Sequence, residues 1–189
     1  MKKFLALIML VMSSVVHGDS QEFEGYSMTV LLPVDWTAGK RQNLVVTIPK
    51  GYRSIQPPSE WTKAPVVEFI PQGEGDHAWS EIITTQRLAG ARASADKVVQ
   101  VIRQNMAATA TNIHVVMSTA SKRSYQMAFY ILKYRHQGRE EMMGMQYFSG
   151  PHDCSGVQYT IRLGDQMSEH EATAKICEFF EHSLQLTGE

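Results

Sequence analysis

The consecutive residues His152, Asp153 and Cys154 place an imidazole, a carboxylate and a thiol side by side. A cysteine hydrolase needs a thiolate within hydrogen-bond reach of an imidazole that a third group orients. Adjacent side chains in a turn rich in Gly, Pro and Ser seldom face one another in that way. We therefore expect no catalytic nucleophile here. The competing role for Cys154 is a disulfide with Cys177, the other cysteine of the chain.

The N-terminal segment indicates the compartment of the protein, and the compartment determines whether these cysteines are oxidised. Lys2 and Lys3 precede an apolar run over 4–12, and Val16-His17-Gly18 then leads into Asp19. A positive start, an apolar stretch and a small residue before the cut are typical of a bacterial signal peptide. A membrane-spanning helix needs about 20 apolar residues, and this run is shorter. The sequence predicts a signal peptide over residues 1–18, export to the periplasm or the extracellular medium, and no transmembrane segment in the mature chain.

Export favours a disulfide between Cys154 and Cys177. An even number of cysteines in an oxidising compartment is typical of bridged pairs. The chain-entropy model gives about 3 kcal/mol of stabilisation for a loop of this length. Cys154 precedes the last predicted strand and Cys177 lies in the last predicted helix, so we expect the bridge to hold that helix on the sheet.

Metal-binding patterns are weak in this sequence. The histidines that remain after cleavage form neither a His-x-x-x-His pair nor a His-Glu-x-x-His motif; they are His77, His114, His136, His152, His170 and His182. Met142, Met143 and Met145 could suit copper(I), but their place in a predicted strand favours core packing. Gly73-Glu74-Gly75-Asp76 lacks the ligand alternation of a calcium loop and favours a hairpin turn. We expect no metal site and no cofactor.

Charge and aromatic residues narrow the class of partner. The chain has 18 basic and 19 acidic residues without a basic block, which argues against nucleic acid or an anionic membrane surface as partner. Trp61 follows Pro57-Pro58 and is the candidate for an exposed contact with a protein partner. Trp79 stands at the start of a predicted strand, which favours the core.

Apolar periodicity predicts the elements that position these residues. Alternating or continuous apolar runs predict strands over 27–32, 43–48, 66–70, 79–88, 125–134, 140–148 and 157–163. Ser94 is a candidate N-cap for an amphipathic helix over 95–108. Ser168 and Glu171 form a capping box before a stripe of Ala172, Ile176 and Phe179. We expect a loose segment over 19–26 and one α+β domain over 27–189, with a largely antiparallel sheet and two main helices packed on it.

Some of these segments resemble a known family. Val67-Glu68-Phe69-Ile70-Pro71-Gln72-Gly73-Glu74, followed after a short gap by Trp79-Ser80-Glu81-Ile82-Ile83-Thr84, is similar to PsbP/DcrB-like proteins. The segment from Ile48 to Tyr52 also fits. The resemblance implies a sandwich fold shared by accessory and binding proteins, among them photosystem lumen subunits and effector chaperones. It implies no single chemistry, and the signal peptide separates this chain from the cytosolic chaperones.

Together these features predict a non-catalytic accessory or interaction protein of the bacterial envelope or the secreted space. Two alternatives stay open. A small-ligand or lipid-binding protein would use a cavity between the sheet and the helices. A hydrolase without a recognisable motif would bring acid, base and nucleophile together in a cleft.

Overall fold

The computed structural model describes residues 9–10, 28–35, 41–56, 66–89, 94–122, 126–149 and 153–188. The signal-peptide cleavage site, Trp61 and His152 lie outside these ranges. The elements in chain order are β1 (Met9–Leu10), β2 (Met28–Asp35), β3 (Arg41–Ile48), β4 (Tyr52–Ser54), β5 (Val66–Pro71), β6 (Glu81–Ala89), α1 (Ala95–Met106), β7 (Ala110–Lys122), β8 (Gln126–His136), β9 (Arg139–Ser149), β10 (Asp153–Arg162), α2 (Glu169–Ser183) and β11 (Leu184–Gly188).

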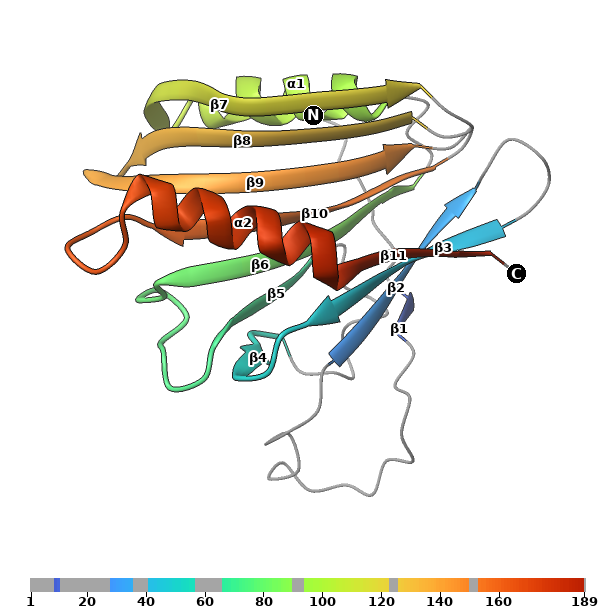
Figure 1. Ribbon diagram of the computed structural model, residues 1–189, viewed down its shortest axis with the longest axis horizontal. Coiled ribbons are helices and arrows are strands. Elements are labelled where there is room, and N and C mark those ends of the chain that lie inside the picture. Colours follow the sequence, from blue (N-terminus) through green and yellow to red (C-terminus); the bar gives the residue numbers. More distant parts are fainter. Residues whose placement is uncertain are drawn as a thin grey trace.

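A seven-stranded antiparallel sheet organises the molecule, in the order β4-β5-β6-β10-β9-β8-β7 (Figure 1). Helix α1 and helix α2 each pack on this sheet. The predicted α+β class, with a largely antiparallel sheet and two main helices, is confirmed. Successive side chains of a strand point to opposite faces, so the two helices cover different residues of the same strands.

The two faces carry separate hydrophobic cores. The core on the side of α2 includes Met142 and Phe148 of β9, together with Ile176. The core on the side of α1 includes Met143 and Met145 of the same strand. We call these the α2-side core and the α1-side core. Strand β8 contributes to both, which agrees with the apolar residues predicted on both of its alternating sets.

A smaller sheet completes the α2-side core. Its order is β1-β2-β3-β11, and Leu44, Val46 and Ile48 of β3 are fully buried in that core. Strands β2 and β3 lie close to the predicted ranges, but the second sheet was not predicted. Leu184, directly after α2, begins β11 and pairs with Val46. The backbone of β1 falls within the predicted signal peptide.

Both helix starts agree with the sequence. The backbone N–H of Lys97 donates to Oγ of Ser94 at 3.3 Å. At the second helix, Ser168 and Glu171 exchange side-chain and backbone hydrogen bonds in the predicted capping box. Capping satisfies backbone donors that have no partner within the helix.

Strand β7 had no counterpart in the predictions. It pairs with β8, with register shifts between Thr111 and His114 and again between Val115 and Met117. Each shift inserts extra residues opposite one partner, and Asn112 has a positive φ of 54° at the first. These bulges interrupt the alternation of side chains by which a strand is recognised in a sequence. Past them, the ladder with β8 runs without interruption from Met117 to Lys122.

Candidate functional site

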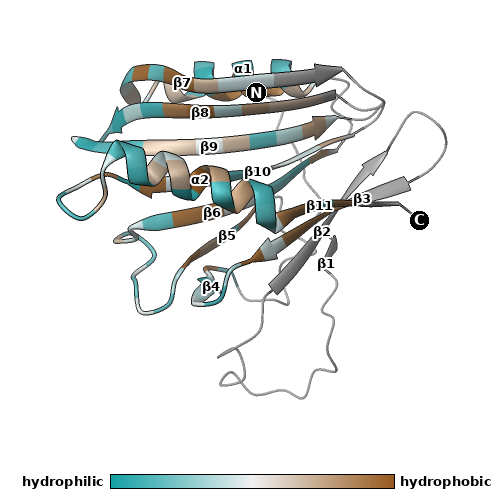
Figure 2. Cartoon of the chain, viewed as in Figure 1, coloured by the Kyte–Doolittle hydropathy of each residue, from teal (hydrophilic) through white to brown (hydrophobic). Residues whose placement is uncertain are grey.

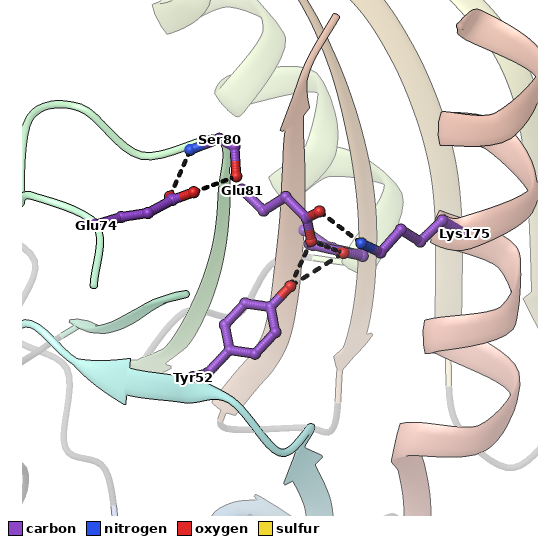
Figure 3. A network of polar contacts seen from close by, with 6 residues as sticks. Tyr52, Glu74, Ser80, Glu81 and Lys175 are labelled. Atoms are coloured by element: carbon purple, nitrogen blue, oxygen red, sulfur yellow. Dashed lines mark hydrogen bonds and ion pairs between the residues drawn. The ribbon is translucent and has the colours of Figure 1, made fainter. Parts of the chain in front are cut away.

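One buried carboxylate accepts hydrogen bonds from donors on three elements. Glu81, the first residue of β6, is 8% exposed. Its Oε2 accepts hydrogen bonds from the hydroxyls of Tyr52 in β4 and Tyr159 in β10. Its Oε1 lies 2.5 Å from Nζ of Lys175 in α2. Figure 3 shows Tyr52 and Lys175 pointing at this carboxylate from different sides.

The surroundings of Glu81 fix its charge. Burial by itself would raise the pKa of Glu81, but the hydrogen bonds from Lys175, Tyr159 and Tyr52 together lower the pKa below its usual value of 4.5. Burial and the neighbouring carboxylate raise the pKa of both tyrosines. At neutral pH the cluster is therefore an ionised carboxylate held by neutral hydroxyl donors and one ammonium group.

This arrangement suits positioning better than acid–base catalysis. A general base needs an oxygen within reach of the proton that it removes from a substrate. Both oxygens of Glu81 already accept bonds from protein groups. The cluster instead ties α2 to β4, β6 and β10.

A second buried carboxylate lies on the opposite face of the sheet. Glu141 of β9 is 2% exposed, and its Oε1 lies 3.3 Å from Nε of Arg162. Its Oε2 lies 3.8 Å from Nδ1 of His136, and the hydroxyl of Tyr134 also bonds this carboxylate. The guanidinium of Arg162 stacks 3.7 Å from the ring centre of Trp79. Glu141, like Glu81, is thus held by protein donors on neighbouring strands.

Trp79 differs from the prediction. It precedes β6 instead of starting a strand, and it is half-buried instead of lying in the core. Its carbonyl oxygen accepts a hydrogen bond from Arg162 at 2.5 Å, so stacking and hydrogen bonding hold the guanidinium at the end of the sheet.

The predicted hairpin turn at Gly73-Glu74-Gly75-Asp76 is confirmed. It joins β5 to β6, and Gly73 has a positive φ of 85° that favours glycine. Oε2 of Glu74 accepts a hydrogen bond from the backbone N–H of Ser80 at 2.7 Å, and Asp76 pairs with Arg53 at 2.7 Å. This loop is hydrophilic, whereas β5 is largely hydrophobic (Figure 2). The acidic side chains therefore organise the loop itself.

The structure does not join Cys154 to Cys177. Cys154 is buried and Cys177 is half-buried. Cys154 belongs to the α1-side core, whereas Cys177 packs against the α2-side core, so the sheet lies between them. The predicted bridge placed Cys154 in a loop, but the residue lies inside β10, where its direction is set by the pleat.

Thiol labelling tests the predicted disulfide. We expect labelling of the native, non-reduced protein to modify Cys177, which is half-buried, and to spare the buried Cys154. Denaturant without reductant should then expose Cys154 as well, giving two labels by mass. Two cysteines that stay unlabelled until a reductant is added would restore the disulfide.

The predicted metal-ligand candidates do not converge. Met142 packs in the α2-side core, and Met143 and Met145 pack in the α1-side core, which confirms core packing for all three. His77, His114, His170 and His182 are exposed, while His136 lies beside Glu141. Among the described residues, no group of three or more His, Cys, Asp or Glu is placed to hold a metal ion.

The exposed large apolar residues gather on β7. Val115, Val116 and Met117 are 43%, 39% and 41% exposed, and Val101 of α1 is 44% exposed.

In the described part of the chain, β7 is the last strand of the larger sheet. No charged residue occurs from Val115 to Ser121. We call the backbone of Met117–Ser121, on the side away from β8, the β7 edge. The Val, Ile and Thr content of 111–119 was the signal in the sequence that could have indicated this strand.

Comparisons with known proteins identify neither a family nor a function. No family model matches the chain, and no curated protein matches it. LpqN of Mycobacterium tuberculosis, described as involved in cell envelope biogenesis, aligns over 83% of this chain and 90% of its own, with 13% identity and a TM-score of 0.49. A Pseudomonas aeruginosa protein of unknown function aligns over 80% of this chain and 92% of its own, with 10% identity and a TM-score of 0.44. A Bacteroides thetaiotaomicron structure gives 11% identity and a TM-score of 0.43, and the match covers 76% of this chain but 45% of that protein.

Proposed function

We propose that this protein is an exported accessory protein that acts by binding a protein partner and not by catalysis. Its binding element is the β7 edge. The protein belongs, in this proposal, with the PsbP/DcrB-like proteins that the segment Val67–Glu74 resembles. No helix in the described residues is long and apolar enough to cross a membrane.

The uncharged outer edge of β7 carries this proposal. Sheet edges are usually protected by charge, by short length or by a covering element, because their unpaired backbone groups attract other strands. The opposite edge, β4, is three residues long and includes Arg53. The β7 edge is regular, lacks charge and lies next to the exposed apolar residues. These are the features of an edge that accepts an added strand.

The two buried carboxylates support the non-catalytic part of the proposal. Glu81 and Glu141 are the buried acidic residues of the described ranges, and protein donors already occupy both. Neither has a cysteine thiol among its hydrogen-bond partners in the described residues. The small-ligand and hydrolase alternatives have no comparable observation in their favour there.

Site-specific photo-crosslinking in exporting bacterial cells tests the proposal. A photoreactive amino acid at Ser118, which is exposed in β7, should give a discrete cross-linked species. The same group at Asp165, exposed in the turn before α2, is the control and should give none. The cross-linked chain should lack residues 1–18 by mass. Equal yields at the two positions would contradict a binding role for β7, and retention of residues 1–18 would contradict export.

A further inference from the structure

We propose that the β7 edge binds a second copy of this chain, so that two larger sheets join into one continuous sheet. This inference rests on the proposed function and names the partner of the same surface. Its starting point is the uninterrupted ladder from Met117 to Lys122. Because the inner side of this segment pairs regularly with β8, the backbone N–H and C=O groups on its outer side are regularly spaced as well.

The absence of charge on the β7 edge favours a second copy of this chain as its partner. Two identical strands that pair antiparallel about a two-fold axis place residues equally far from the axis opposite each other. With Thr119 on the axis, Met117 faces Ser121 and Ser118 faces Ala120. No charged residue then faces its own kind, which would be destabilising. An edge that carried charge would instead select a partner of opposite charge. The β7 edge carries no charged residue, and another copy of the chain supplies an equally uncharged strand.

Apolar exposure points the same way. Val115 pairs with Leu132 of the α1-side core, and Met117 pairs with Ile131 of the α2-side core. Cross-strand partners share a face, so the exposed residues occur on both faces of the sheet at this edge. A strand added by a second copy covers apolar surface on both faces, and two-fold symmetry uses each contact twice.

Within the larger sheet, the topology leaves one short edge after this pairing. Pairing through β7 consumes that edge in each copy. The remaining edge, β4, is three residues long, which is too short to propagate an open fibre. The bulges before Met117 end the regular pairing on the other side. The expected product is a closed dimer.

Introducing a positive or a negative charge at Thr119 tests the pairing of the two copies. Sedimentation of the mature protein over a range of concentrations should show a monomer–dimer equilibrium. Thr119→Lys and Thr119→Glu should each raise the dimer dissociation constant at least about tenfold, because like charges meet on the axis. An equimolar mixture of the two variants should restore the dimer. Thr109→Lys, in the exposed turn before β7, should dimerise like the unmodified protein.

The outcomes separate the two proposals. A protein that stays monomeric at all concentrations, or Thr119 variants that dimerise normally, would overturn the second copy as occupant. In that case a Ser118 cross-link to a different protein would leave the proposed function standing. Absence of any Ser118 cross-link, together with a monomer, would overturn both. Circular dichroism of each variant confirms that it is folded.

Discussion

Gly144→Ala is expected to lower the free energy of unfolding by about 1–3 kcal/mol, the usual cost of overfilling a packed core. Gly144 lies in β9 beneath α2. A Cβ at this position would overlap Cγ2 of Ile176 and come within 2.7 Å of Cε2 of Phe180. Because both atoms belong to a helix that Glu81 and the α2-side core hold in place, the helix must move to admit one methyl group. Urea unfolding followed by circular dichroism measures the change.

Two further variants make this result specific. Gly164→Ala is the matched control, because a Cβ there meets no atom within 4 Å and its φ is not positive. It should be neutral or slightly stabilising. Ile176→Ala removes the atom that is overlapped, so combining it with Gly144→Ala should cost less than the sum of the two changes. Equal stability of Gly144→Ala and Gly164→Ala would show that α2 does not pack on β9 as described.

Glu81→Leu is expected to cost about 1–3 kcal/mol, because the hydroxyls of Tyr52 and Tyr159 lose the acceptor that they share, and only one of them can donate to the other across the 3.2 Å between them. The half-exposed Lys175 can return to water and should add little. Chemical denaturation at neutral pH measures the loss. A loss of unfolding free energy below that of a typical surface substitution would show that the contacts of Glu81 do not stabilise the fold.

Acid should weaken the same contacts between Glu81 and its hydrogen-bond donors. The pKa of Glu81 is lowered in the folded state, so the folded protein binds fewer protons than the unfolded chain near pH 4.5. The stabilisation is therefore fully present above pH 4.5 and is lost as the pH falls through the lower, folded pKa. Glu171 also has a lowered pKa, through its hydrogen bonds with Ser168, and contributes in the same direction. The difference between the unmodified protein and Glu81→Gln isolates the Glu81 part, and parallel stability curves below pH 4.5 would contradict it.

The sequence predicted the elements whose signals are local. The Ser94 cap, the capping box at Ser168 and the turn at Gly73 depend on neighbouring residues, and all three were found. Alternation also located β10, which starts earlier than predicted and takes in Cys154. That shift places Cys154 on the α1 side of the sheet, because a residue inside a strand has its direction fixed by the pleat.

Non-local features could not be predicted in the same way. Glu81, Tyr52, Tyr159 and Lys175 are far apart in the chain and meet only through the order of strands in the sheet. Nothing in the residues around Glu81 distinguishes it from a surface carboxylate. The β7 edge was hidden for another reason, since its two bulges break the alternation that identifies a strand.

Hydrogen exchange at β7 tests the central claim most directly. Backbone amides of 117–121 that face away from β8 exchange quickly unless another strand covers them. At concentrations that populate the dimer, we predict slowed exchange in this segment, reversed by dilution and by Thr119→Lys. Exchange in the turn 107–109 should stay the same throughout. Exchange over 117–121 that is independent of both concentration and the Thr119 substitution would contradict binding at the β7 edge by a second copy.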